Sequence, residues 1–182
     1  MSRIKVVTKD TADSDQTALL DAIQAKLGMV PNFLGVLAHS TDALGAFLGL
    51  HGIAEAGRLD AQTRERIALA IAQSNSCEYC LSAHTAIGRN AGLSNAEMDA
   101  NRSGTSEDEK AAAAIAFAQA VNANLGDVTQ AELNAVRDAG HSEAEIVEII
   151  THVGMNILTN LIGKTAQVDI DFPKVSLLAK AA

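Results

Sequence analysis

The sequence contains little proline, few aromatic residues and no tryptophan. Its 182 residues include two prolines, four phenylalanines and one tyrosine. A core with so few rings must be built from Ala, Leu, Ile and Val, a composition that favours closely packed helices over strands. No segment alternates polar and apolar residues with a period of two, which is the pattern of a half-buried strand. The expected fold class is therefore all-α.

Clusters of basic residues and long apolar runs are also missing. The net charge is −8, and the lysines and arginines are scattered, so nucleic acid is not an expected partner. The first residues, MSRIKVVTKDTADSD, contain no apolar signal-peptide core. The longest apolar stretches are interrupted before the ~18 residues that a membrane helix needs. We therefore expect a soluble, cytoplasmic protein with no membrane partner.

The length suits one domain with a genuine core, so we expect a single domain over residues 1–182. Capping residues and glycines divide it into helix-length segments. The predicted helices run from Asp13/Ser14 to Gly28, from Pro31 over a short stretch, from Ser40/Thr41 to Gly57, from Asp60 to about Gln73, from Ser76 to Gly92, from Ser94 to about Arg102, from a Ser106/Glu109 capping box to Asn124, from Thr129 to Gly140, and from Ser142 to about Ala166. The final DIDFPKVSLLAKAA is expected to form an extended strap with a short apolar tail.

Cysteine is scarce as well, and the only two lie together in SNSCEYCLSAHT. In a reducing compartment such a pair is more often catalytic or metal-binding than a permanent staple. If Ser76 caps a helix, Cys77 lies in its first turn, where free N–H groups and the helix dipole favour a thiolate. At 3.6 residues per turn, Cys77, Cys80 and His84 fall within an arc of roughly 60°. Two thiols and a base therefore converge, and the one-turn separation predicts an intramolecular disulfide in the oxidised protein.

Glu65, in the preceding helix, is the candidate partner of His84. It lies on a stripe of small apolar residues, where an unpaired carboxylate would cost several kcal/mol. The break at Ser74 to Ser76 folds its helix back towards the dithiol helix, so His84 can pair with Glu65 directly or through water. His84 would then act as the base for Cys80. The remaining histidines have no spacing relation to the cysteines and are expected to be caps or surface residues: His39, His51, His141 and His152.

The four residues form an E-x11-C-x2-C-x3-H pattern, which resembles the AhpD-like alkylhydroperoxidases of the carboxymuconolactone decarboxylase superfamily. The flanking LDAQTRERIALAIA and AHTAIGRNAGLS resemble the helix pair of that family, and NILTNLIGKTAQVDIDFP resembles its longer, peroxidase-related branch. The resemblance implies an AhpD-like helical bundle, thiol peroxidase chemistry without a metal or other cofactor, and a homo-oligomer that is a dimer, a trimer or a hexamer.

The resemblance also implies roles by motif position. Cys80 attacks a hydroperoxide, Cys77 is the resolving thiol, and Glu65 with His84 relays protons. An external dithiol of the lipoyl or thioredoxin type resets the disulfide. The peroxidase branch has a histidine where this chain has Tyr79, which we expect only to pack, so one relay member is missing. The decarboxylases of the superfamily lack the CxxC pair, which argues against decarboxylation.

Two alternatives stay open. The chain could be a general dithiol–disulfide oxidoreductase, or a non-enzymatic redox sensor or metal-binding module using Cys77, Cys80, His84 and Glu65, a set that zinc would accept. Taken singly, each of these residues also fits a purely structural role, and only their combination favours chemistry. The Ala-rich segment between Ala111 and Ala123 is expected to bury part of its surface against a second copy.

Overall fold

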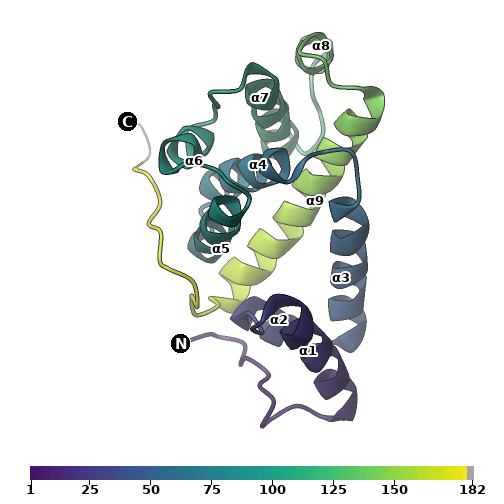
Figure 1. Ribbon diagram of the computed structural model, residues 1–182, viewed down its shortest axis with the longest axis vertical. Coiled ribbons are helices and arrows are strands. Elements are labelled where there is room, and N and C mark those ends of the chain that lie inside the picture. Colours follow the sequence, from purple (N-terminus) through teal and green to yellow (C-terminus); the bar gives the residue numbers. More distant parts are fainter. Residues whose placement is uncertain (180–182) are drawn as a thin grey trace.

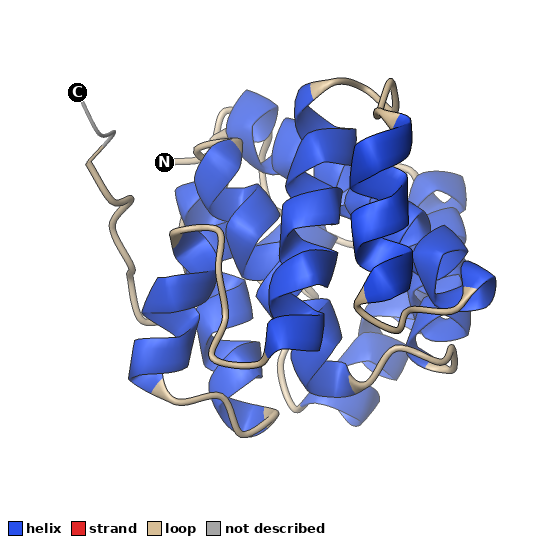
Figure 2. Ribbon diagram, turned by 90° about the horizontal axis from the view of Figure 1, so that it is seen from above, coloured by secondary structure: helices blue, strands red, loops and turns tan. Residues whose placement is uncertain are grey.

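The computed structural model describes residues 1–179, and every regular element within them is an α-helix (Figures 1 and 2). The helices are α1 (Ser14–Leu27), α2 (Asn32–Leu37), α3 (Thr41–Glu55), α4 (Ala61–Ser74), α5 (Glu78–Asn90), α6 (Asn95–Arg102), α7 (Glu109–Ala123), α8 (Gln130–Asp138) and α9 (Glu143–Ala166). The all-α prediction is confirmed.

Most helices begin where a short polar side chain accepts a hydrogen bond from a free backbone N–H group of the first turn. These caps are Asp13, Ser40, Asp60, Ser94, Asp108, Thr129 and Ser142. Two predicted starts are wrong. Ser76 does not cap α5, because it has a left-handed backbone with φ of 56°, and Cys77 takes that place. Ser106 does not cap α7, because its hydroxyl donates to Glu97 Oε1.

Helices α4 and α9 form the centre of the bundle. Helix α9 crosses the molecule obliquely and packs against α2, α3, α4, α5 and α7 (Figure 1). Helix α4 packs against α5, α6, α7 and α9, and residues 67–72 are buried on every side. Among residues 1–179, α9 is long and apolar enough to cross a membrane by length and composition. The expectation that every apolar stretch is too short for this did not anticipate α9. Here 44% of its apolar window is buried inside the bundle.

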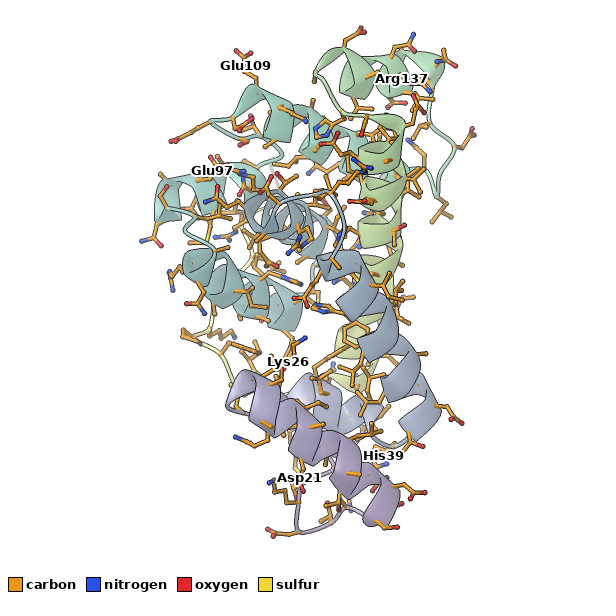
Figure 3. The ribbon with its side chains drawn as sticks, turned by 45° about the vertical axis from the view of Figure 1, so that its right-hand side comes forward. Asp21, Lys26, His39, Glu97, Glu109 and Arg137 are labelled. Atoms are coloured by element: carbon orange, nitrogen blue, oxygen red, sulfur yellow. A yellow bond between two sulfur atoms is a disulfide. The ribbon has the colours of Figure 1, made fainter. Side chains whose placement is uncertain are left out.

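Two apolar clusters fill the interior. One lies between α4, α7, α8 and the first half of α9, and the other joins α1, α2, α3, α5, the end of α9 and the strap. Both cysteines belong to the second cluster. Figure 3 labels Glu97, Glu109 and Arg137 in the upper half of the molecule and Asp21, Lys26 and His39 in the lower half.

The Ala-rich helix α7 does not offer the free surface that the sequence suggested. Its apolar side is already buried within the chain against α4, α8 and α9. The buried residues are Ala111, Ala114, Ile115, Phe117, Ala118 and Val121. Small side chains here serve close packing between helices of one chain, so less of this segment is left for a second copy than the sequence suggested; its contact with a second copy stays a prediction.

The C-terminal strap runs in extended form along α5 and α6 (Figure 1). The Val175 N–H donates to Ser82 Oγ, the Leu178 N–H donates to Gln73 Oε1, and Arg102 donates to the Ser176 carbonyl. The predicted strap is therefore present as far as residue 179. The rest of the predicted apolar tail, residues 180–182, lies outside the described residues.

Tyr79 joins three separate segments in the second cluster. Its hydroxyl accepts a hydrogen bond from the Phe33 N–H at the start of α2, and its ring stacks edge-on against Phe172 of the strap. Burial, opposed by that hydrogen bond and reinforced by the nearby Asp171 carboxylate, raises the pKa of Tyr79. The side chain packs as predicted, and in addition ties α2 and the strap to the dithiol helix.

The raised pKa of Tyr79 predicts how stability depends on pH. The folded protein keeps the phenol proton above pH 10, whereas the unfolded chain loses it near the ordinary tyrosine pKa of 10.0. Stability should therefore fall as the pH rises above 10. Since the chain has one tyrosine and no tryptophan, phenolate absorbance reports this group directly. Tyr79→Phe should remove that pH dependence and cost about 1–3 kcal/mol in denaturant unfolding, because the Phe33 N–H loses its partner.

The matched control is Phe172→Leu, which removes the ring contact and leaves the hydroxyl bond intact. It should destabilise the fold without abolishing the alkaline loss of stability. A normal phenol titration near pH 10 in the folded wild-type protein would contradict the burial argument.

Candidate functional site

The turn between α4 and α5 positions the two cysteines. The Cys77 N–H donates to the Ala72 carbonyl at 2.9 Å, and the Asn75 N–H donates to the Ile71 carbonyl at 2.9 Å. Between them, the left-handed backbone of Ser76 reverses the chain. Cys77 becomes the N-cap of α5, and its Sγ accepts a hydrogen bond from the Cys80 N–H at 3.3 Å. One sulfur is therefore held by the free N–H groups of a helix start.

Cys77 and Cys80 are joined by a disulfide, with their Cα atoms 5.3 Å apart. They are 1% and 3% exposed. Helix α9 covers them with backbone rather than side chain, because a Cβ atom at Gly163 would lie 3.2 Å from Cys77 Sγ and 3.6 Å from Cys80 Sγ. The structure thus contains the intramolecular bond that the CxxC spacing predicted.

Glu65 and His84 meet across the α4–α5 interface. His84 Nδ1 lies 2.8 Å from Glu65 Oε2, and the side chains are 21% and 15% exposed. Gly88 of α5 allows Leu93 and Met98 to pack closely against the helix, because an added Cβ would lie 3.2 Å from Leu93 and 3.3 Å from Met98. With Nδ1 donating to the carboxylate, Nε2 is the free basic nitrogen of the ring. The predicted direct contact is present, and His84 lies one helical turn after Cys80.

Two further histidines lie near this pair, which the sequence gave no reason to expect. His152 on α9 is buried, and burial together with the charge of Arg64 lowers its pKa to about 4. His51 on α3 is half-buried, and burial lowers its pKa in spite of Glu55, with the charge of His84 acting in the same direction as burial. The prediction that His152 is a cap or a surface residue is wrong, because it faces the interior of the bundle.

His141 is also buried, contrary to the prediction, and its Nε2 lies 3.0 Å from the Lys110 carbonyl. His39 fits the predicted surface role, with Nε2 2.8 Å from the Lys5 carbonyl. Neither is part of the dithiol region. The histidines that reach the Glu65 and His84 pair come from α3 and α9, so chain spacing carries no signal for them.

Two cavities among residues 1–179 lie away from the disulfide. The larger, about 390 Å³, lies between α4, α6 and the loop before α7, and the smaller, about 70 Å³, lies beside His141 and Glu145. Within residues 1–179, no three His, Cys, Asp or Glu side chains are grouped closely enough to hold a metal ion. The groups near the dithiol that could take part in chemistry are therefore the two sulfurs, the His84 imidazole and the Glu65 carboxylate.

Comparison with known proteins places this arrangement in context. A family model described as the carboxymuconolactone decarboxylase family matches residues 41–123, which include all four motif residues. An alkylhydroperoxidase AhpD core structure, an uncharacterized peroxidase-related protein from Ralstonia eutropha JMP134, is 26% identical with a TM-score of 0.84. The match covers 93% of this chain and 92% of that chain. No curated protein matches the sequence.

Two further solved structures share the fold. An uncharacterized peroxidase-related protein from Silicibacter sp. TM1040 is 23% identical with a TM-score of 0.79, over 91% of both chains. The debrominase Bmp8, in a cysteine-to-alanine variant bound to 2,3,4-tribromopyrrole, is 20% identical with a TM-score of 0.77, over 92% of this chain and 91% of that chain. At these identities the likeness speaks for the fold alone.

Proposed function

Since the chain belongs to the carboxymuconolactone decarboxylase and AhpD-like superfamily, we propose that it is a thiol-dependent peroxidase that reduces hydroperoxides through Cys80 and Cys77. The observation that carries the proposal is the dithiol itself: a buried Cys77–Cys80 disulfide one turn from an imidazole that a carboxylate holds. A dithiol that closes to a disulfide within one turn can take two electrons from a small oxidant and be reset by an external dithiol.

In the proposed reaction, the Cys80 thiolate attacks the terminal oxygen of the hydroperoxide and the O–O bond breaks. The alcohol leaves with a proton from the His84 imidazolium, and Cys80 becomes a sulfenic acid. The Cys77 thiolate then attacks the Cys80 sulfur, the S–O bond breaks, and the oxygen leaves as water after taking a further proton. The product is the Cys77–Cys80 disulfide, which an external dithiol of the lipoyl or thioredoxin type reduces by exchange.

The Glu65 and His84 pair supplies the base in this scheme. Because an ionised carboxylate can only accept a hydrogen bond, Glu65 holds the ring with Nδ1 as the donor, which leaves Nε2 to take the proton of Cys80. Tyr79 takes no part in the relay, because its phenol is buried, its hydroxyl is bound to the Phe33 N–H and its pKa is raised. We therefore propose slower turnover than in relatives with a histidine at this position.

The alternatives have less support. A general dithiol–disulfide oxidoreductase would use the same residues, but sulfurs that are 1% and 3% exposed suit a small oxidant better than a protein disulfide. A metal-binding role has no grouped ligand set among residues 1–179. The debrominase neighbour acts on a different substrate class, so a brominated pyrrole belongs in any substrate panel. The cytoplasmic location stays a prediction.

The function is tested by adding a few equivalents of organic hydroperoxide to the reduced protein. Both thiols should be lost, and peptide mapping should find the Cys77–Cys80 bond. Cys80→Ser should abolish peroxide consumption, whereas Cys77→Ser should still react once and accumulate a sulfenic acid. Protein disulfides, a lipoyl-type disulfide and a brominated pyrrole serve as competing oxidants. Equal loss of reaction in both variants, or faster thiol oxidation by a disulfide than by peroxide, would sink the peroxidase proposal.

Glu65→Gln should slow the reaction of Cys80 with peroxide by about 10²-fold, the lower range for acid–base assistance, while the fold is kept. The substitution removes the carboxylate charge 2.8 Å from His84 Nδ1 and preserves volume. His84→Gln should cost at least as much, and the double variant little more than the worse single one, because both act on one proton path. The measurement is the rate of Cys80 oxidation against pH.

The matched control is Glu55→Gln, which removes a carboxylate 3.6 Å from His51 rather than the one that holds His84. It should leave the rate–pH profile in place. An unchanged profile in Glu65→Gln would show that the Glu65 and His84 contact is structural.

We further propose that the protein is a homo-oligomer, and that copies meet through an apolar face formed by α3 and α9. This α3/α9 face carries exposed large side chains: Leu50, Ile53, Val147, Ile150, Leu158 and Leu161. Helix α3 also contains Gly45, Gly49 and Gly52, and added Cβ atoms there would meet nothing within 4 Å. Glycine inside a helix costs up to about 1 kcal/mol, and no packing within the chain requires it here.

Ile53 is 76% exposed and Leu161 is 60% exposed, so charged residues at these positions leave the folded chain intact. Ile53→Lys combined with Leu161→Lys should reduce the mass by light scattering at micromolar concentration. The matched control is Leu125→Lys, which introduces a charge at a residue that is 88% exposed in the loop after α7. A monomeric wild-type protein, or equal dissociation by Leu125→Lys, would refute the α3/α9 interface.

A further inference from the structure

Three asparagines form a hydrogen-bonded group behind the dithiol turn. Asn75, directly before Ser76, pairs with Asn122 of α7 through two bonds, Asn75 Nδ2 to Asn122 Oδ1 at 3.1 Å and Asn122 Nδ2 to Asn75 Oδ1 at 3.0 Å. Asn75 Nδ2 also donates to Asn160 Oδ1 at 2.9 Å. In the structure, Asn75 Nδ2 donates to both partners, and Asn160 accepts this bond through Oδ1.

The amide nitrogen of Asn160 is left as a spare donor. Asn160 is 2% exposed, and its Nδ2 has no hydrogen-bond partner. A buried donor without a partner costs about 1–3 kcal/mol, and such groups are few in native proteins. Turning the amide over would not remove the cost, because Asn75 Nδ2 would then face a second donor. The unpartnered donor therefore needs a physical explanation.

The position of Asn160 on α9 supplies one. Gly163 lies one turn further along the same face, where an added Cβ would stand 3.2 Å from Cys77 Sγ and 3.6 Å from Cys80 Sγ. Lys164, the next residue, donates from Nζ to the Asn75 carbonyl at 2.6 Å. This single turn of α9 therefore packs against the chain from Asn75 to the disulfide. The unpartnered amide of Asn160 lies beside the turn that carries Cys77.

We infer that Asn160 Nδ2 is the hydrogen-bond donor for the thiolate of Cys77 in the reduced protein. A disulfide sulfur is a weak acceptor, whereas a thiolate is a strong one, so the donor has a partner in the reduced form and none in the oxidised form. Reduction breaks the S–S bond and frees Cys77 Sγ to approach the amide. The Cys80 N–H already donates to the same sulfur, so Asn160 supplies the second donor.

This assignment deepens the proposed function and rests on it only for the catalytic consequence. In that scheme, the Cys77 thiolate attacks the Cys80 sulfenic acid, the S–S bond forms, the S–O bond breaks, and water leaves after the oxygen takes a proton. Asn160 makes the attacking group available at neutral pH by favouring thiolate over thiol. It acts on the second, resolving step and not on the attack on peroxide.

The test uses Cys80→Ser protein, in which Cys77 is the only thiol and no peroxide is needed. Thiolate absorbance against pH gives the titration midpoint of Cys77. Adding Asn160→Leu should raise this midpoint by about one pH unit or more, because a hydrogen bond to a charged group is lost. The matched control is Asn122→Leu, which also removes one partner of Asn75 but leaves the Asn160 donor in place. It should lower thermal stability and leave the midpoint unchanged.

A midpoint that Asn160→Leu does not move, or one that Asn122→Leu raises equally, would overturn the assignment. If Asn160→Leu does not fold, Asn160→Ser takes its place, since a serine hydroxyl is too short to replace the amide. In the two-cysteine protein, Asn160→Leu should prolong the lifetime of the Cys80 sulfenic acid about tenfold without slowing its formation. If Asn160→Leu raises the midpoint of Cys77 but the two-cysteine protein does not react with peroxide, the role of Asn160 is supported and the peroxidase function is rejected.

Discussion

The packing of α9 backbone against the two sulfurs at Gly163 is the constraint on which the site depends. A Cβ atom at this position would stand 3.2 Å from Cys77 Sγ, so any other residue would require the sulfur or the helix to shift by a few tenths of an ångström. The next residue of the same helix, Lys164, donates a hydrogen bond to the Asn75 carbonyl in the α4–α5 turn. Cys77 and Cys80 are nearly without solvent contact, and α9 is the helix that covers them at Gly163. The same helix carries Asn160 and the buried His152.

The two sulfurs have unlike surroundings, which is unexpected for two cysteines one turn apart. Cys77 caps α5 and accepts a backbone hydrogen bond, so its environment is made of fixed N–H dipoles that do not change protonation. Cys80 lies one turn before His84, which contacts Glu65, so an ionisable side-chain pair lies one turn further along α5. Fixed N–H donors stabilise a thiolate that persists, whereas an ionisable pair suits a thiol that loses a proton in one step and regains it in another.

The sequence was informative where the interactions are local. Helix starts were found because a cap bonds within three residues, and Glu65 and His84 were paired because a short turn folds two consecutive helices back on each other. It failed where the partner is distant in the chain. Nothing near Cys77 points to Asn160 or Gly163, and His152 reaches the same region from α9. The misplacement of the cap at Ser76 has another cause, since a left-handed serine cannot be distinguished from a capping serine by residue type.

The burial of the dithiol sets a requirement on any partner. His84 is the most exposed of the four motif residues, at 21% of its side chain, whereas Cys80 is closed in on the other sides by Tyr79, the second apolar cluster and α9. In the proposed reaction, a dithiol that attacks the disulfide must bring its own sulfur nearly into line with the S–S bond. That approach requires that contacts on one side of the turn be broken. The strap is held to α5 by the bond of the Val175 N–H to Ser82 Oγ, by an exposed ion pair between Lys174 and Glu78, and by the ring contact of Phe172 with Tyr79. The hydrogen bond and the ion pair are individually weak, so Tyr79 is the side chain that most firmly joins the strap to the dithiol helix.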